Sequence, residues 1–226
     1  MTTTKLPSFT DLRTRWSPLL DGLPLVPRTL ASLAADLAKR HSEPARVYHG
    51  LEHIDALAKL YREVAEIASW RTPAEVKLAI LFHDAIYEPG HLDNEERSAG
   101  LAETYLSTSI VDHVRVAAMI RATKAHGEAE VGTDHDFAHF LDADMAIIGA
   151  PGPTYERYAE QVAAEFSKVP SAMYRLGRIA FLRGQLAREQ LFHTNYFRAR
   201  FGVRARVNLT KELRRLEAEA GESAPA

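Results

Sequence analysis

The chain has 226 residues, 46% of them apolar, and a formal charge of -2 from 28 basic and 30 acidic side chains. This composition supports one sizeable core and gives no overall attraction to nucleic acid as a bulk ligand or to anionic lipid. The absence of cysteine excludes disulfides, thiolate nucleophiles and cysteine-bound zinc, so any metal must be held by nitrogen and oxygen. The polar N-terminus lacks a signal peptide's apolar core and no stretch is long enough to span a membrane, so we expect a cytoplasmic protein.

Apolar residues recur at spacings of three and four almost throughout, which predicts an all-α chain. The first predicted elements are a short helix around Trp16 and helices over about 30–39 and 47–68. The Thr72-Pro73-Ala74-Glu75 segment predicts a further helix start, because it combines a capping hydroxyl, a first-turn proline and a returning glutamate. That helix continues through the apolar run 78–82, and the unbroken run predicts a central helix that is covered on most sides.

The second half of the chain repeats this pattern. Asp93 and Glu96 predict a capping box at the next helix start, after the Pro89-Gly90 break. The later predicted helices span about 111–124, 138–148, 154–168, 171–191 and 209–220, the last beginning after Asn208. We expect one compact helical domain over 1–220, including a C-terminal helical extension, and a disordered tail over 221–226.

Three separate segments bring histidine or aspartate to otherwise apolar surroundings. His83 and Asp84 end the most apolar segment of the chain, and adjacent helical residues can both reach a cation at the helix edge. His49 and His53 lie four residues apart about thirty positions earlier, which on a helix means one face. The Leu141-Asp142-Ala143-Asp144 segment supplies carboxylates about sixty positions later. Histidine, then histidine-aspartate, then a distant aspartate therefore predicts a metal centre.

This ordered pattern resembles the HD superfamily of metal-dependent phosphohydrolases, and most of the chain resembles one bacterial subgroup of predicted HD phosphohydrolases. The resemblance is carried by Tyr48-His49...His53, Phe82-His83-Asp84-Ala85-Ile86-Tyr87, Asp93-Asn94-Glu95-Glu96-Arg97-Ser98, Leu141-Asp142-Ala143-Asp144 and Arg206-Val207-Asn208-Leu209. It implies an HD-type helical domain with His53 as the first histidine ligand, His83 and Asp84 as the central pair, and Asp144 as the last carboxylate.

Two of these assignments have alternatives within the same segments. His49 could replace or join His53 as a ligand, since the two share a face of the predicted helix, and we favour His53. Asp142 and Asp144 lie about 200° apart on a helix, so both cannot point at one metal. We favour Asp144, which leaves Asp142 as a cap, a partner of a ligand or a surface residue.

Two imidazoles and two carboxylates suit a divalent transition metal, namely manganese, iron, cobalt, nickel or zinc, with iron or manganese as the first expectation. Such a cation leaves room for water and for a phosphoryl oxygen, and it lowers the pKa of bound water. Asp84 is expected both to ligate the metal and to orient the attacking water.

Four further residues are candidates for catalysis. Glu95 and Glu96 could act as base, proton donor or partner of a ligand, although acidic residues also favour a helix N-terminus whatever the function. Lys124 and His126 could contact phosphate, although basic residues likewise stabilise a helix C-terminus.

The expected function is hydrolysis of a small phosphate ester, a nucleotide or related metabolite, by metal-activated water. One alternative is a phosphodiesterase for cyclic or linear nucleotides, although the Gly-Tyr-Pro signature of the cyclic dinucleotide branch is missing. Another is a non-catalytic sensor that binds nucleotides through the metal. The basic residues between Arg198 and Arg215 are typical of a solvated helix face, since few aromatic residues interleave them. The expected partner is therefore a small phosphorylated substrate, and a homodimer is also compatible with the sequence.

Overall fold

The computed structural model describes residues 7–126, 129 and 131–222, and all regular elements within them are helices, as the apolar spacing predicts. The α-helices are α1 (Phe9–Arg15), α2 (Ser17–Leu20), α3 (Pro27–His41), α4 (Leu51–Ile67), α5 (Pro73–Phe82), α6 (Asn94–Leu106), α7 (His113–Ala122), α8 (His135–Met145), α9 (Gly152–Glu165), α10 (Ser171–Ala187) and α11 (Asn195–Glu222). Three short 3₁₀ turns follow α7, α8 and α9: η1 (Thr123–Ala125), η2 (Ala146–Gly149) and η3 (Phe166–Lys168).

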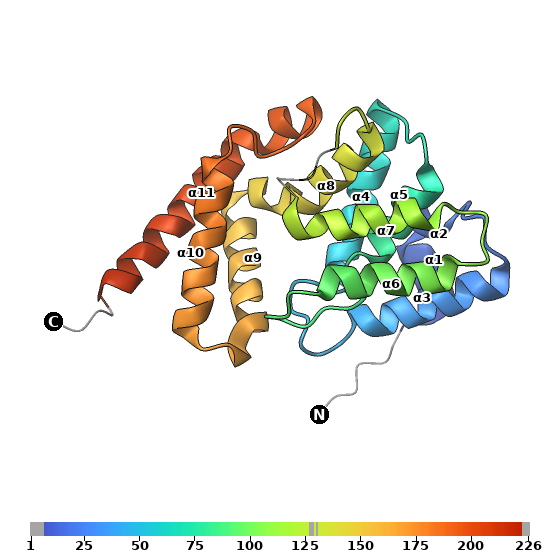
Figure 1. Cartoon of the computed structure of the whole chain (residues 1–226), viewed down its shortest axis with the longest axis horizontal. Coiled ribbons are helices and arrows are strands. Elements are labelled where there is room, and N and C mark those ends of the chain that lie inside the picture. Colours follow the sequence, from blue (N-terminus) through green and yellow to red (C-terminus); the bar gives the residue numbers. More distant parts are fainter. Residues whose placement is uncertain (1–6, 127–128, 130, 223–226) are drawn as a thin grey trace.

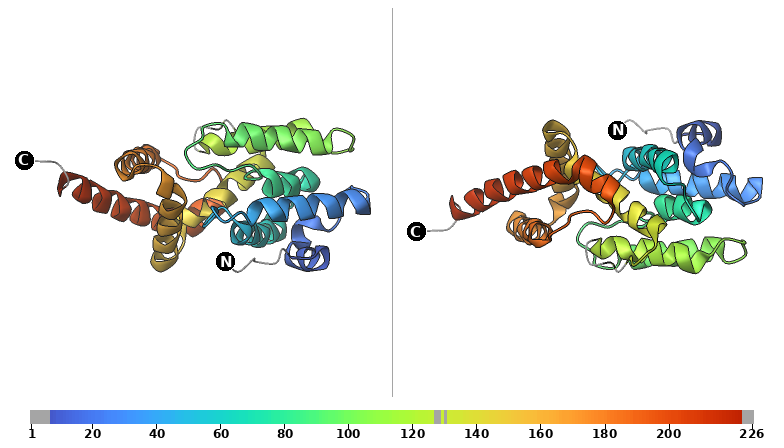
Figure 2. Two further views of the ribbon diagram at one scale, coloured as in Figure 1. Left: turned by 90° about the horizontal axis from the view of Figure 1, so that it is seen from below. Right: turned by 90° about the horizontal axis from the view of Figure 1, so that it is seen from above.

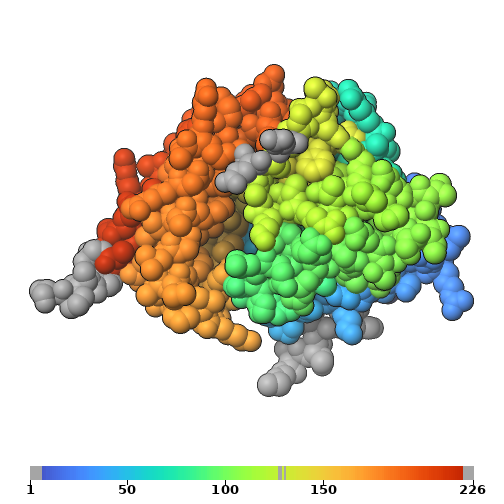
Figure 3. Space-filling view, viewed as in Figure 1, coloured from blue at the N-terminus to red at the C-terminus, as the bar shows by residue number. Residues whose placement is uncertain are grey.

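The helices form two groups that lie side by side (Figures 1 and 2). One group contains α1 to α8, with α5 packed against α2, α4, α6, α7 and α8. The other contains α9, α10 and α11, and α11 reaches back to contact α8 and η2. On the face seen in Figure 3, a furrow separates α10 from the green surface of α6 and α7.

Helix α5 is the central helix that its unbroken apolar run predicts. Its buried residues are Val76, Leu78, Ala79, Ile80, Leu81 and Phe82. Because nearly every face of α5 is covered, the residues that follow it emerge in the interior of the first group rather than on the surface. This position explains how His83 can lie in the protein interior.

The predicted starts of α5 and α6 are confirmed, but neither start is held by the predicted capping box. The side chain of Thr72 makes no cap, because its hydroxyl and backbone N–H donate to the Asp136 carboxylate at 2.8 and 2.7 Å. At the start of α6, Asp93 makes no side-chain cap either, and Glu96 pairs with Arg121 of α7 at 2.7 Å. In both cases a partner from another helix replaces the local bond.

Helix α4 begins at Leu51, four residues later than predicted, so His49 precedes the helix. The backbone N–H groups of Tyr48 and His49 donate to the Glu165 carboxylate of α9 at 2.8 and 2.9 Å. A side chain distant in sequence thus satisfies both backbone donors. The prediction that His49 and His53 share one helical face is therefore wrong.

The end of the chain differs most from the prediction. Helix α10 ends at Ala187 and α11 already begins at Asn195, so Asn208 lies inside α11. Its side-chain amide donates to the carbonyls of Ile148 and Ala150 at 2.9 Å each, and it therefore joins α11 to the η2 turn instead of starting a helix. Helix α11 runs through Glu222, two residues into the predicted tail. Residues 223–226 of that tail lie outside the described residues.

The η2 turn and α11 approach closely at Gly149. A Cβ atom built there would lie 2.5 Å from the Phe201 Cβ and 2.7 Å from its carbonyl oxygen, so only glycine fits.

Among the described helices, none is long and apolar enough to cross a membrane.

Candidate metal centre

Four predicted ligands from three segments converge in the interior of the first helix group. His53 lies in the first turn of α4, His83 and Asp84 follow α5 directly, and Asp144 lies near the end of α8. The Nε2 atoms of His53 and His83 are 3.0 Å apart. Asp144 Oδ1 lies 3.0 Å from His53 Nε2 and 3.5 Å from His83 Nε2. Asp84 Oδ2 lies 3.1 Å from His83 Nε2 and 3.9 Å from His53 Nε2.

The cluster opens toward solvent on the side of its carboxylates. The side chains of His53 and His83 are 4% and 1% exposed, whereas those of Asp84 and Asp144 are 15% and 11% exposed. A ligand would therefore approach past the carboxylates, with the two imidazoles at the back.

The orientation of His83 leaves a lone pair for a cation. Its Nδ1 lies 2.9 Å from the Ile80 carbonyl, which can only accept, so Nδ1 carries the proton. In the neutral ring, Nε2 then presents a lone pair toward His53 Nε2 and the carboxylates. Among the predicted ligands, His53, His83 and Asp144 together could hold a metal ion, because their ligand atoms all lie within 4.8 Å of one another. Asp84 does not belong to this group, although its carboxylate lies 3.1 Å from His83 Nε2.

Charged neighbours strongly shift the pKa values of His83 and Asp144. Burial lowers the pKa of His83, but Asp84 and Asp144 outweigh burial and raise the pKa well above its ordinary value. Burial raises the pKa of Asp144, but His83, His126 and His53 outweigh it and hold this pKa well below its usual range. Without a metal the cluster therefore holds a proton near neutral pH, which means that it attracts positive charge.

Arg46 supports the cluster from behind and was not predicted from the sequence. Its side chain is 1% exposed, and its guanidinium donates to the backbone carbonyls of His49, Asp84 and Ala85. The guanidinium also lies over the Tyr87 ring, 5.6 Å from the centroid. The turn that presents Asp84 is thereby fixed. In the sequence Arg46 looks like any surface arginine.

His49 lies beside the cluster and is bound by a residue that was also not predicted, Glu165. His49 Nδ1 donates to Glu165 Oε2 at 2.7 Å, and the Tyr87 hydroxyl donates to the same oxygen at 3.1 Å. The His49 ring packs on the Tyr87 ring at 4.2 Å and lies 5.9 Å from the His53 ring, between centroids. Because His53, and not His49, belongs to the group that could hold an ion, the structure favours His53 as the ligand.

The two aspartates of α8 have different partners. Asp144 faces the cluster, whereas Asp142 accepts hydrogen bonds from the backbone N–H groups of His193 and Thr194, both at 2.7 Å. This agrees with the expectation that one helix cannot aim both carboxylates at one metal. Asp142 instead anchors the turn that leads into α11.

The remaining catalytic candidates separate into two sets. His126 reaches the cluster, because its Nε2 donates to Asp144 Oδ2 at 2.6 Å. Lys124 is exposed and donates to the Leu92 carbonyl at 2.6 Å, and the exposed Glu96 is paired with Arg121, so neither is drawn into the cluster. Glu95 is half-buried in the first turn of α6. Among the described residues, it makes no hydrogen bond or ion pair with the cluster.

The arrangement supplies nitrogen and oxygen ligands for one cation, an open side toward solvent and two further imidazoles, His49 and His126, at its edge. No family model, curated protein or solved structure matches this chain.

Proposed function

We propose that the protein is a metal-dependent phosphohydrolase of a small phosphate ester, a nucleotide or related metabolite, and that it belongs to the HD superfamily. The observation that carries this proposal is the convergence of His53, His83, Asp84 and Asp144 from three distant segments, with Nε2 and carboxylate oxygens 3.0–3.9 Å apart. The residues that carry the sequence resemblance to the superfamily are thus the residues whose side chains lie close together, which supports the proposal.

These four side chains would hold the ion, with manganese or iron as the first choice among divalent transition metals. When bound, the cation would supply a Lewis acid that activates water and stabilises negative charge on the phosphorus centre. Arg46 keeps the Asp84 turn in place, and His126 fixes the orientation of the Asp144 carboxylate through its 2.6 Å hydrogen bond. Both residues therefore support the ligand set without belonging to it.

His49 is suited to transfer a proton to the leaving group. Glu165, which is fully buried, fixes the proton on Nδ1, so Nε2 is the ring atom that remains for a substrate. Burial lowers the pKa of His49, but Asp84 and Glu165 outweigh it and raise the pKa above its ordinary value. As water adds to phosphorus and the ester P–O bond breaks, the imidazolium of His49 would donate its Nε2 proton to the departing oxygen.

The test is a substrate screen with defined metal content. Protein stripped by a chelator and reloaded with manganese, iron, cobalt, nickel or zinc is incubated with nucleotides, sugar phosphates and cyclic or linear dinucleotides, and the products are identified. We expect phosphate release from a monoester, and its loss in His83→Ala and Asp84→Asn. The control His91→Ala changes an exposed histidine in the loop before α6 and should leave turnover unchanged.

A substitution of His49 distinguishes a role in proton transfer from a role in metal binding. His49→Gln should lower kcat about 10²- to 10⁴-fold, the usual value of a general acid, while metal content measured by mass spectrometry stays at the wild-type level. Loss of the metal from His49→Gln would make His49 a ligand instead. Tight metal-dependent nucleotide binding with no product after long incubation would show that the protein is a sensor and not an enzyme. Turnover that is unchanged in His83→Ala would reject the metal-dependent mechanism.

A further inference from the structure

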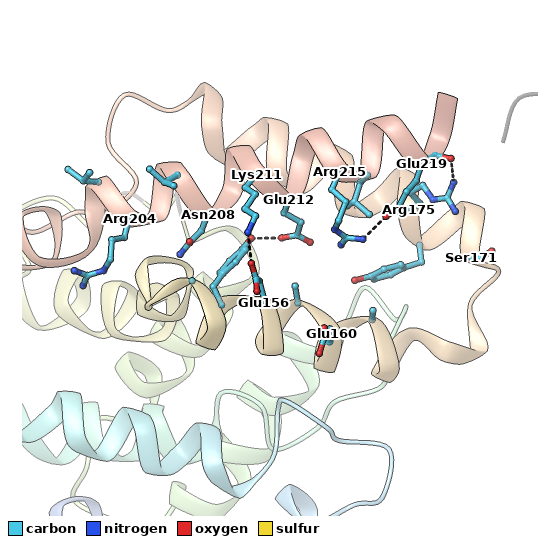
Figure 4. Close-up of a pocket in the computed structure, with 18 residues that line it drawn as sticks. Glu156, Glu160, Ser171, Arg175, Arg204, Asn208, Lys211, Glu212, Arg215 and Glu219 are labelled. Carbon is cyan, nitrogen blue, oxygen red and sulfur yellow. Dashed lines mark hydrogen bonds and ion pairs between the residues drawn. The ribbon is translucent and has the colours of Figure 1, made fainter. Parts of the chain in front are cut away.

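A groove of about 880 Å³ lies between α9, α10 and α11, in the helix group that supplies none of the four metal ligands (Figure 4). Small side chains of α9 line it, including Gly152, Ala159 and Ala163. At its α11 edge, Val203 and Val207 are 78% and 61% exposed, and they lie on one face because they are four residues apart. The groove thus combines a floor that a helix can approach closely with two large apolar side chains open to solvent.

The two long walls of the groove carry opposite charges. Its α11 wall presents Arg204 and Lys211, whereas its α9 wall presents Glu156 and Glu160 (Figure 4). The acidic residues of α11 that line the groove are paired: Glu212 is buried against Arg178 at 2.9 Å, and Glu219 accepts from Arg215 at 2.7 Å.

One ion pair bridges the walls within the chain. Lys211 Nζ lies 2.6 Å from Glu156 Oε1, with the two side chains 76% and 53% exposed. Pairs this exposed contribute little to stability, so either partner can exchange for an equivalent charge on another molecule.

We propose that this groove is the interface between two copies of the chain, with α11 of each copy lying in the groove of the other. In a two-fold dimer each contact occurs twice. Val203 and Val207 would be buried over the small side chains of the partner's α9, and Arg204 and Lys211 would face the acidic wall of the partner. The result is an apolar centre with a charged rim, the usual anatomy of a protein interface.

A second copy fits the groove better than a polyanion does. Nucleic acid would be attracted by Arg204 and Lys211 but repelled by Glu156 and Glu160 across a narrow gap, and it offers nothing apolar for the two valines. Another copy of this chain carries both complementary walls and matching apolar side chains. The basic residues of α11, which the proposed reaction does not use, then have a role.

The valines supply the first test. Sedimentation velocity of the full chain should show a dimer, and Val207→Asp should shift it to monomer. The matched control is Val114→Asp on α7, which is 64% exposed and lies outside the groove, and which should remain dimeric. Circular dichroism and thermal melts establish that all three proteins are folded. A wild-type protein that is monomeric at its highest soluble concentration would overturn the proposal, as would equal effects of the two substitutions.

Reversed charges supply the second test, which distinguishes contacts between copies from contacts within one. Lys211→Glu and Glu156→Lys each place like charges on facing walls, so each variant alone should be mainly monomeric. Mixed in equal amounts they should form a heterodimer, because glutamate at 211 then faces lysine at 156 of the other chain. The pair within each chain stays broken in the mixture, so recovery can only come from contacts between chains. A mixture that sediments as monomer would contradict the proposed dimer.

Discussion

The cluster at His53 and His83 is chemically incomplete without a cation. Two Nε2 atoms 3.0 Å apart cannot both present lone pairs to each other without repulsion, so either a proton or a metal ion must lie between them. Asp84 and Asp144 favour both occupants. The proton and the metal therefore compete for one position.

We expect metal affinity to rise with pH for this reason. The pKa of His83 is raised well above its ordinary value, so the metal-free site is protonated at neutral pH and each bound ion displaces about one proton. The association constant should then increase about tenfold per pH unit until the pH passes that pKa. Calorimetry in buffers of different ionisation enthalpy measures the protons released, and an affinity that is flat across neutral pH would contradict the expected competition.

His41 is a buried imidazole outside the cluster, and it should make stability depend on pH. Its Nε2 donates to the Leu81 carbonyl at 3.2 Å, and its Nδ1 has no hydrogen-bond partner among the described residues. Burial, together with the charge of Arg46, lowers its pKa from 6.5 to about 3. The folded state thus excludes a proton that the unfolded state binds, so stability is complete above pH 6.5 and falls as the pH drops toward 3.

The expected loss from His41 is about 2 kcal/mol at about pH 5 relative to pH 8. Urea unfolding of the wild type and of His41→Gln, which keeps a donor for the Leu81 carbonyl, measures it as the difference between their pH dependences. If the two proteins lose stability equally on acidification, His41 is not the responsible group.

At the scale of single residues, the sequence predicted the four side chains that lie close together, but not the residues that hold them in place. His53, His83, Asp84 and Asp144 stand out because their residue types are unusual within apolar segments. Glu165 could not be identified this way, because a glutamate on an amphipathic helix looks solvated unless the packing of that helix is known.

Helix α8 has two duties, one for each of its aspartates. Asp144 faces the metal centre, and Asp142 receives the N–H groups of His193 and Thr194 directly before α11. The carboxylate therefore holds the two residues that precede α11, rather than capping that helix. The same helix thus orients a candidate metal ligand and holds the turn that leads into α11.

These duties should separate on mutation. Asp142→Ala leaves two partly buried N–H groups without their carboxylate and should cost about 1–3 kcal/mol of unfolding free energy, with metal affinity unchanged. Asp144→Ala should instead lower metal affinity by at least about 100-fold, because even the loss of a group that only supports a ligand costs about 10- to 100-fold. Urea titrations and calorimetry on both variants decide this, and loss of metal from Asp142→Ala would show that the two roles are not separate.

Element boundaries failed where tertiary hydrogen bonds replaced local ones. Asparagine is a residue type common at helix caps, yet the Asn208 amide donates to the carbonyls of Ile148 and Ala150 from inside α11. At Thr72 the predicted helix start is correct, but the hydroxyl donates to Asp136 instead of capping the helix. Cap residues are recognised by type, and the same types serve equally well as long-range hydrogen-bond donors.

For the whole molecule, apolar spacing was sufficient to predict an all-helical chain with a central α5, because helical periodicity can be read from residues close together in sequence. The division into two helix groups was not predictable, since it depends on contacts between residues far apart in sequence, such as Glu165 with His49. Through these contacts α9 reaches the edge of the candidate metal centre, although it supplies none of the four predicted ligands.

The central claim is that one cation binds where the three segments meet. Crystals grown with manganese, measured at a wavelength where manganese scatters anomalously, test it most directly. We expect one anomalous peak at ligand distance, about 2.0–2.2 Å, from His53 Nε2, His83 Nε2 and carboxylate oxygens of Asp84 and Asp144. An anomalous map with no peak among these four side chains, at a manganese concentration that saturates binding in solution, would contradict the account.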